Sequence, residues 1–529
     1  MGRRPVFLAI LAAALVLVPT APAVAAPTVS VSAVSVSPSG FDLDSADIPA
    51  LQARMASGRL TAVGLTSTYL DRIHRIDGKV HAVLAVNPAA LSQASASDAR
   101  RRKHHLRGPL DGIPVLVKDN VDTRDQWTTA GSRALRSYPA KDATLITRLR
   151  DAGAVILGKA NLSEWANFRA AKPTSGWSGV GGQTNNPYVL DHNPCGSSAG
   201  SAAGVAASLA QVAIGSETDG SIVCPAGMTS TVGHKPSLGL VSRTGVVPIS
   251  AEQDTAGPIA RNVVDVALTL SVLQGRDRSD PATLTYPRTQ PKDYAKLLRP
   301  GVLRGARIGL WRLPVLGPAT DAIMTSARNS LVRAGATVVE VTLPYQARLG
   351  ELEFPALLTE FHRDIDAYLA TRPTGPRNLA DLIAYNRADP LERTCFAGQE
   401  LFEQALAAPP PTDPGYLAGR AELSDLARRS LDETLANHHL DAIASPTNPP
   451  AWKTDCAVGD DDVIPSSTPA AVAGYPDVTV PAGFAGPLPV GISFMGARWS
   501  DARMLALAAD FERVAPARVA PRYLPTVPS

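Results

Sequence analysis

Cysteine is scarce in this chain, with four among 529 residues. A fold that depends on many disulfides is therefore excluded, because disulfide-dense domains are short and carry far more cysteine. No Cys or His spacing matches a zinc pattern, so no metal site is expected. Aromatic residues make up 5% of the chain and the formal net charge is +3. A nucleic-acid partner is not predicted, because such surfaces combine clustered basic and aromatic side chains.

Long apolar runs are also missing, apart from one near the start of the chain. That run, from Val6 to Val18, follows Arg3 and Arg4 and precedes the small residues 23–25. This arrangement is typical of a secretory signal peptide, and the run is too short for a comfortable membrane span. We expect residues 1–25 to be cleaved during Sec or twin-arginine export and residues 26–44 to be a flexible leader. The mature protein should be secreted, without stable membrane insertion.

Strand and helix patterns alternate from residue 48 onward. Helices are expected over residues 49–57, 61–75, 88–102, 142–152 and 320–334, and strands over residues 80–86, 154–157, 307–311, 337–341, 440–444, 478–480 and 491–494. This alternation predicts an α/β layered fold with a largely parallel sheet. Residues 45–520 should form one domain, in which a mostly helical region, about residues 349–439, roofs the substrate cleft.

Two serine clusters bounded by glycine interrupt this pattern. The first, residues 196–200 (GSSAG), precedes a small-residue helical segment, and the second, residues 219–221 (DGS), follows a short strand over residues 212–214. Glycine permits backbone conformations that other residues resist, so both clusters are predicted at breaks in regular structure. A third unusual feature is Lys118, which closes an apolar run typical of a strand buried on both faces.

Together these motifs resemble the amidase signature enzymes. The matching segments are GIPVLVK (112–118), PCGSSAGS (194–201), ETDGSIVCPA (217–226) and shorter ones at residues 233–236, 241–243, 254–258, 470–476 and 489–491. The resemblance covers roughly residues 45–515 and is closest to bacterial peptide amidases, through residues 161–168 and 217–221. It implies one large mixed, mostly parallel, twisted sheet covered by helices on both faces. No cofactor is expected.

The resemblance also implies roles for particular residues. Ser221 would be the nucleophile, Lys118 the base, and Ser197, after a cis peptide bond, the proton carrier between them. The backbone N–H groups of Thr218, Asp219, Gly220 and Ser221 would bind the anionic oxygen, with Gly196 and Ser198 in supporting positions. A lysine base must lose its proton, and burial at the end of an apolar strand lowers a lysine pKa. Many relatives have glycine where this chain has Asp219, whose side chain has no assigned role.

Another motif in the same stretch gives a competing interpretation. Residues 196–200 satisfy the G-x-S-x-G pattern of α/β-hydrolases, which would make Ser198 the nucleophile and recruit His438 or His439. Such an elbow needs a strand leading into it, and the residues before Gly196 contain a proline and cannot form an ordinary central strand. His192 and His234 are expected to be structural.

The cysteines fall into two pairs. Cys195 and Cys224 lie inside the serine motifs, where they are expected to be small buried packing residues. Cys395 and Cys456 lie in loop-like segments, and an exported protein could bridge them, a question that the sequence leaves open.

These observations favour an exported serine amidohydrolase that forms an acyl-enzyme on Ser221. Its substrates would be small or peptide amides, with peptide C-terminal amides expected. The alternatives are an amidase or esterase for other aliphatic or aryl compounds, and a non-catalytic amide-binding relative. The amidase subunit of the tRNA-dependent amidotransferases also resembles the chain, but a signal peptide argues against that role. The sequence does not indicate an oligomeric state.

Overall fold

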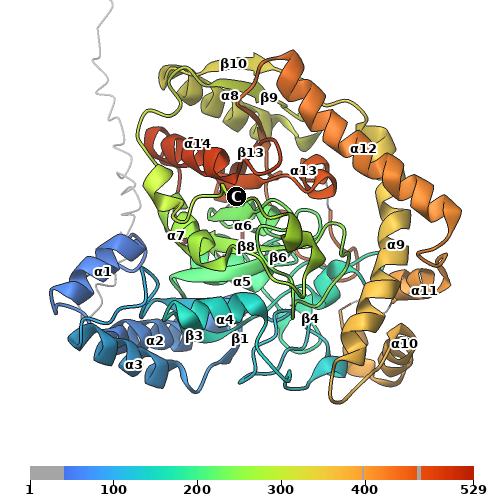
Figure 1. Ribbon diagram of the computed structural model, residues 1–529, viewed down its shortest axis with the longest axis horizontal. Helices are drawn as coiled ribbons and strands as arrows, with labels where there is room; N and C mark the ends of the chain where they lie inside the picture. Colours follow the sequence, from blue (N-terminus) through green and yellow to red (C-terminus); the bar gives the residue numbers. More distant parts are fainter. Residues whose placement is uncertain (1–40, 396–397, 462–465, 529) are drawn as a thin grey trace, which may run out of the picture.

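The computed structural model describes residues 41–395, 398–461 and 466–528, so the expected signal peptide lies outside the described residues. A sheet of eleven strands runs through the molecule in the order β1-β3-β2-β6-β8-β7-β12-β13-β11-β9-β10 (Figure 1). Its strands are β1 (Val83–Val86), β2 (Pro114–Lys118), β3 (Val155–Ala160), β6 (Val212–Glu217), β7 (Val232–Lys235), β8 (Thr255–Ala260), β9 (Arg307–Leu310), β10 (Thr337–Glu340), β11 (Ala442–Pro446), β12 (Asp477–Ala485) and β13 (Leu488–Met495). A separate pair joins β4 (Trp177–Ser178) to β5 (Gly182–Gln183).

The large sheet is mixed, as expected. Strands β3, β2 and β6 pair in parallel, and so do β11, β9 and β10. Between these two groups every pairing is antiparallel, and so is the pairing of β1 with β3. The expected parallel pairing therefore describes the two flanks, whereas the centre is antiparallel. There β8 runs antiparallel to both β6 and β7, and the β12–β13 hairpin inserts between β7 and β11.

Helices cover the sheet on both faces. Helices α5 and α6 contact each other and the central strands, while α7, α14 and α8 form a second group against the same strands (Figure 1). The helices are α1 (Ile48–Ala56), α2 (Ala62–Val80), α3 (Ala90–Arg102), α4 (Thr144–Asp151), α5 (Ala199–Ala206), α6 (Val223–Met228), α7 (Val263–Leu273), α8 (Pro318–Arg333), α9 (Gln346–Ala370), α10 (Leu379–Ala388), α11 (Glu400–Ala407), α12 (Pro414–Asn437), α13 (Thr468–Ala473) and α14 (Asp501–Val514).

Burial explains why the strands near the site are so apolar. Every residue of β2, β3 and β6 is buried, because helices close both faces of the sheet. Helix α5 consists of Ala, Gly, Ser and Val, and a side chain at Gly200 would collide with the backbone of Asn161. Small residues thus let α5 lie directly on the sheet, and the residues just before it, including Ser197, are held at the end of β2.

Several boundaries differ from the sequence-based expectations. The expected leader reaches residue 44, yet Phe41 and Leu43 are buried in the main core and Asp44 forms an ion pair with Arg72. Helix α2 continues to Val80 rather than ending at residue 75, and His81 ends it in a left-handed conformation. The sequence pattern does not predict strands β7 and β8 or helix α7, which the structure contains. At the other end, Leu524 pairs with Val189, so the packed chain extends past residue 520.

The region after β10 is helical, from α9 to α12. Helices α9, α10 and α11 share a second apolar core, and α12 packs along α9 at one side of the molecule (Figure 1). Over the ranges that the structure describes, no helix has the length and apolar character needed to cross a membrane.

Candidate active site

Lys118 lies at the carboxyl end of β2, fully buried. Its amine is 2.8 Å from Ser197 Oγ, 3.0 Å from Ser216 Oγ and 3.1 Å from the Ser216 carbonyl oxygen. Burial lowers the pKa of Lys118 to about 7, although the carboxylates of Glu217 and Asp254 act in the opposite direction. A large fraction of this amine is therefore neutral near pH 7, and a neutral amine can accept a proton.

Ser197 and Ser198 lie between the Gly196–Ser197 peptide bond, which is cis, and the start of α5. Both are fully buried, but their hydroxyls have different partners. Ser197 Oγ meets the Lys118 amine, whereas Ser198 Oγ accepts from the Ser216 N–H at 3.2 Å and donates to the Ser216 carbonyl at 3.1 Å. Ser198 thus ties its segment to β6, and Ser197 is the hydroxyl directed at the lysine.

Ser221 lies on the turn between β6 and α6, next to Gly220, whose φ of +76° favours glycine. It lines a cavity of about 490 Å³, together with Gly196. Hydrogen bonds with Ser198 and Glu217 help to hold this turn. The Ser198 N–H donates to the Ser221 carbonyl at 3.1 Å, and the Glu217 carboxylate accepts from the N–H groups of residues 222 and 223 at 2.7 and 3.0 Å.

Three of the four residues expected to bind the anionic oxygen line the same cavity. The cavity wall includes Asp219, Gly220 and Ser221, and no group in the described part of the chain accepts a hydrogen bond from their N–H groups. Thr218, the fourth residue expected here, is anchored by its hydroxyl, which donates to Asp254 at 2.5 Å. Consecutive free N–H groups on a turn can bind an anionic oxygen.

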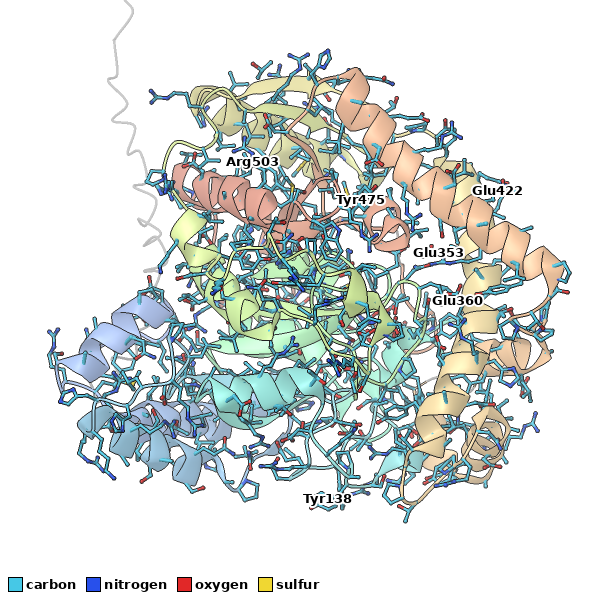
Figure 2. The ribbon with its side chains drawn as sticks, in the orientation of Figure 1. Tyr138, Glu353, Glu360, Glu422, Tyr475 and Arg503 are labelled. Atoms are coloured by element: carbon cyan, nitrogen blue, oxygen red, sulfur yellow. A yellow bond between two sulfur atoms is a disulfide. The ribbon has the colours of Figure 1, made fainter. Side chains whose placement is uncertain are left out.

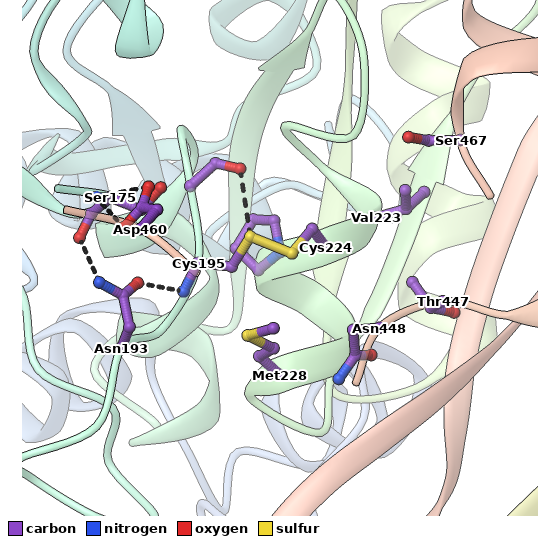
Figure 3. The surroundings of a disulfide bond; sticks show 12 residues. Ser175, Asn193, Cys195, Val223, Cys224, Met228, Thr447, Asn448, Asp460 and Ser467 are labelled. Atoms are coloured by element: carbon purple, nitrogen blue, oxygen red, sulfur yellow. Dashed lines mark hydrogen bonds between the residues drawn. A yellow bond between two sulfur atoms is a disulfide. The ribbon is translucent and has the colours of Figure 1, made fainter. Parts of the chain in front are cut away.

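A disulfide joins Cys195 to Cys224, at the edge of the same cavity (Figure 3). This corrects the expectation of two separate packing thiols. Periodicity cannot pair cysteines, and the bond forms because the fold brings the two serine segments together. A second disulfide joins Cys395 to Cys456, the pair that the sequence had left open.

The remaining cavity wall comes from distant parts of the chain. Helix α9 contributes Phe354, and α11 contributes Leu401 and Gln404; the other lining residues include Ala166, Asn167, Pro173, Ser175, Trp452, Asp460 and Ser467. The charged side chains of the wall are Asp219 and Asp460, and neither lysine nor arginine lines it among the described residues. The pocket is therefore acidic and partly apolar.

Comparison with known proteins identifies the family of this chain. A family model described as Amidase matches residues 64–505. The chain belongs to the amidase family. This amidase is 39% identical over 499 residues to a probable amidase from Arabidopsis thaliana, with 92% of this chain and 93% of that protein covered.

Two solved structures of peptide amidases are similar to this amidase over nearly its whole length. One, of the peptide amidase PAM in complex with the competitive inhibitor chymostatin, is 48% identical with a TM-score of 0.89 and covers 91% of this chain and 100% of that chain. The other, of native peptide amidase from Stenotrophomonas maltophilia, is 48% identical with a TM-score of 0.87 and covers 90% and 99%.

Asp219 is the site residue whose side chain the sequence left without a role. In this amidase its carboxylate accepts hydrogen bonds from the hydroxyls of Ser467 and Thr468, at the start of α13. Glu353, on α9 (labelled in Figure 2), interacts with this carboxylate, and burial together with the charge of Asp219 raises the pKa of Glu353 well above its usual range. These partners lie far away in sequence, so no local motif could have indicated them.

A chain of side chains continues from Glu353 into the helical region. Gln253 donates to Glu353 at 2.8 Å and accepts from Arg420 of α12 at 2.8 Å. Arg420 also lies 3.3 Å from Glu360 on α9. The turn that carries Ser221 is therefore connected through Asp219 to both long helices of this amidase.

The structure does not support the α/β-hydrolase interpretation, because neither the histidine partner nor the strand before the serine is in place. His438 and His439 are exposed at the end of α12, and no strand of the described chain leads into Ser198. His192 contacts Asp191 at 2.7 Å and His234 is buried beside Asp501. Across the described ranges, no group of three or more His, Cys, Asp or Glu side chains could hold a metal ion.

Replacing either His438 or His439 with alanine should therefore leave kcat within about twofold of wild type, since surface substitutions away from a site have small effects. Amide hydrolysis at neutral pH measures this directly. A loss of a hundredfold or more in either variant would return the histidine-dependent mechanism to consideration.

Proposed function

We propose that this amidase is an exported serine hydrolase that converts carboxamides and water into carboxylic acids and ammonia, and that C-terminal amides of peptides are its substrates. The supporting observation is the 2.8 Å contact between the buried Lys118 amine and Ser197 Oγ, behind the cavity that Ser221 lines. An amine with a pKa of about 7 at that position is suited to general-base catalysis at neutral pH.

In the proposed reaction Ser221 Oγ attacks the carbonyl carbon of the amide. Its proton passes to Ser197 Oγ, whose own proton passes to the neutral Lys118 amine. The carbonyl oxygen becomes an anion and is bound by the N–H groups of residues 218–221. When the intermediate collapses, the proton returns through Ser197 to the leaving nitrogen, which departs as ammonia. Water then attacks the acyl-enzyme by the same relay and releases the acid.

The substrate class is proposed from the relatives and from the cavity. The peptide amidase structures share 48% of their residues with this chain. A cavity of about 490 Å³ with Phe354, Leu401 and Trp452 in its wall suits an amidated residue with an apolar side chain. Aryl and small aliphatic amides or esters would use the same chemistry and form the second candidate class.

Export is proposed from the N-terminal sequence and the cysteines. All four cysteines form disulfides. Disulfides persist mainly in oxidising compartments, which supports secretion through the expected signal peptide.

The function is tested by labelling and turnover together. The purified protein is treated with a fluorophosphonate probe, and the modified residue is located by mass spectrometry. Ammonia release is then measured over dipeptide amides, aliphatic amides and aryl amides. Labelling at Ser221 with fastest release from dipeptide amides supports the proposal. An unlabelled protein without turnover is a binding relative, and fastest turnover of aryl or aliphatic amides assigns the second class.

The acidic cavity predicts a charge preference among peptide amides. Two dipeptide amides that differ only in Gln or Glu as the amidated residue have nearly the same shape. The glutamate substrate should have a kcat/KM about tenfold lower, because Asp219 and Asp460 repel its carboxylate. Ammonia release at pH 8 measures both constants. Equal values for the two substrates would show that the amidated side chain does not face these groups.

A further inference from the structure

The Cys195–Cys224 disulfide connects the two segments that carry the catalytic serines. Cys195 is two residues before Ser197, and Cys224 is three residues after Ser221. A hydrogen bond from the Ser198 N–H to the Ser221 carbonyl, at 3.1 Å, also joins these segments. The disulfide is thus a covalent bridge between the two segments that carry the hydroxyls of the proposed relay.

The backbone conformation at Cys195 would suit glycine, which indicates that cysteine is needed there for its disulfide. Its φ is +61°, in the left-handed region where glycine is the easiest residue to place. Its N–H is held by the side chain of Asn193 at 2.8 Å, and Asn193 in turn donates to the Ser175 carbonyl at 3.0 Å (Figure 3). The disulfide explains why cysteine, and not glycine, occupies this position.

At the other end of the disulfide, Cys224 fixes the turn that carries Ser221. Cys224 lies at the second residue of α6, a helix of six residues that begins immediately after Ile222. Both sulfurs are buried in an apolar cluster that also contains Tyr188 and Met228. The bond therefore holds the start of α6, and with it Ser221, against the segment of Ser197.

We propose that the Cys195–Cys224 disulfide is a positioning element for the two serines, which keeps Ser197 and Ser221 aligned for proton transfer. The inference rests on the function proposed above. Two unbonded sulfurs cannot stay at bonding distance, so loss of the bond lets the two segments separate. A small displacement of reacting groups costs up to about a hundredfold in rate, and it acts on kcat more than on KM.

The test compares two double variants that each lose one disulfide. Cys195→Ala/Cys224→Ala removes the bridge, and Cys395→Ala/Cys456→Ala is the matched control. Active sites are counted with the fluorophosphonate probe, so that kcat refers to competent molecules. Both variants should lose thermal stability. We expect kcat per site to fall about 10- to 100-fold in the first variant, with KM within about threefold, and to stay within about twofold in the control.

A third variant separates the bond from the backbone conformation. Cys195→Gly/Cys224→Ala introduces glycine, which adopts a φ of +61° without strain, and removes the disulfide. It should remain slow. If it, or the alanine pair, reaches the wild-type kcat per site while wild type is labelled at Ser221, the positioning role is wrong and the proposed function still stands. If wild type itself is neither labelled nor active, the proposed function fails.

Native-state reduction covers the case in which the variants do not fold. Dithiothreitol supplies two electrons and two protons, the S–S bond breaks into two thiols, and the reagent leaves as a cyclic disulfide. Alkylation followed by mass spectrometry identifies the molecules reduced at residues 195 and 224. A fall in kcat that parallels this fraction supports the inference, and full activity after complete reduction of this pair overturns it.

Discussion

Replacing Ser221 with alanine should lower kcat at least about 10⁴-fold and abolish labelling by the fluorophosphonate probe. The residual rate would come from the backbone donors and from substrate binding, because removing a nucleophile leaves these intact. KM should change little, since the hydroxyl is small and faces an open cavity. Initial rates of ammonia release and mass spectrometry of the labelled protein measure the two effects.

Ser198→Ala is the matched control for this substitution. Ser198 is a buried serine of the same motif, yet its hydroxyl is occupied by the backbone of Ser216. The variant should keep the label on Ser221, although its stability should fall because buried partners are left unpaired. Labelling that persists in the Ser221 variant and disappears in the Ser198 variant would reverse the two roles.

Replacing Lys118 with methionine should lower kcat about 10²- to 10⁴-fold at neutral pH, the usual contribution of a general base. Burial lowers the pKa of Lys118 to about 7, so the active, neutral amine accumulates as the pH rises through this value. In wild type, kcat should therefore fall about tenfold per pH unit below about 6 and level off above about 8. The methionine variant should lose this inflection, and its remaining rate should rise at high pH with hydroxide.

Lys118→Arg distinguishes a base from a positive charge. Arginine keeps the charge at all accessible pH values and cannot accept a proton. If Lys118 acts as a base, the arginine variant should be as slow as the methionine variant. Recovery of activity in Lys118→Arg, or an unchanged pH profile in Lys118→Met, would contradict the assignment. The measurement is the pH dependence of kcat in wild type and both variants.

The family resemblance seen in the sequence predicted one contact of the site, that between the Lys118 amine and Ser197 Oγ. Lys118 closes an apolar run, and a strand of that kind is buried wherever it lies in an α/β sheet, so its amine had to be desolvated. The serine clusters are bounded by glycine, which placed Ser197 and Ser221 at turns. These are local properties, and local properties can be read from one chain.

Contacts between distant segments were not available from the sequence. The Asp219 carboxylate is bound by Ser467 and Thr468, which lie just before α13 and at its first residue. The bond between Cys195 and Cys224 depends on two motifs meeting in space. Part of the antiparallel centre of the sheet is the β12–β13 hairpin, inserted between β7 and β11, and no periodicity of residues 477–495 indicates which strands flank it.

That hairpin has a consequence for how the protein is made. Strands β9, β10 and β11 join the rest of the sheet through β13 alone. Until a ribosome has released residues 477–495, the growing chain therefore holds two separate half-sheets with unpaired inner edges at β7 and β11. Completion of the sheet has to wait for residues 477–495, and a stop codon before residue 477 would leave aggregation-prone halves rather than a shorter enzyme.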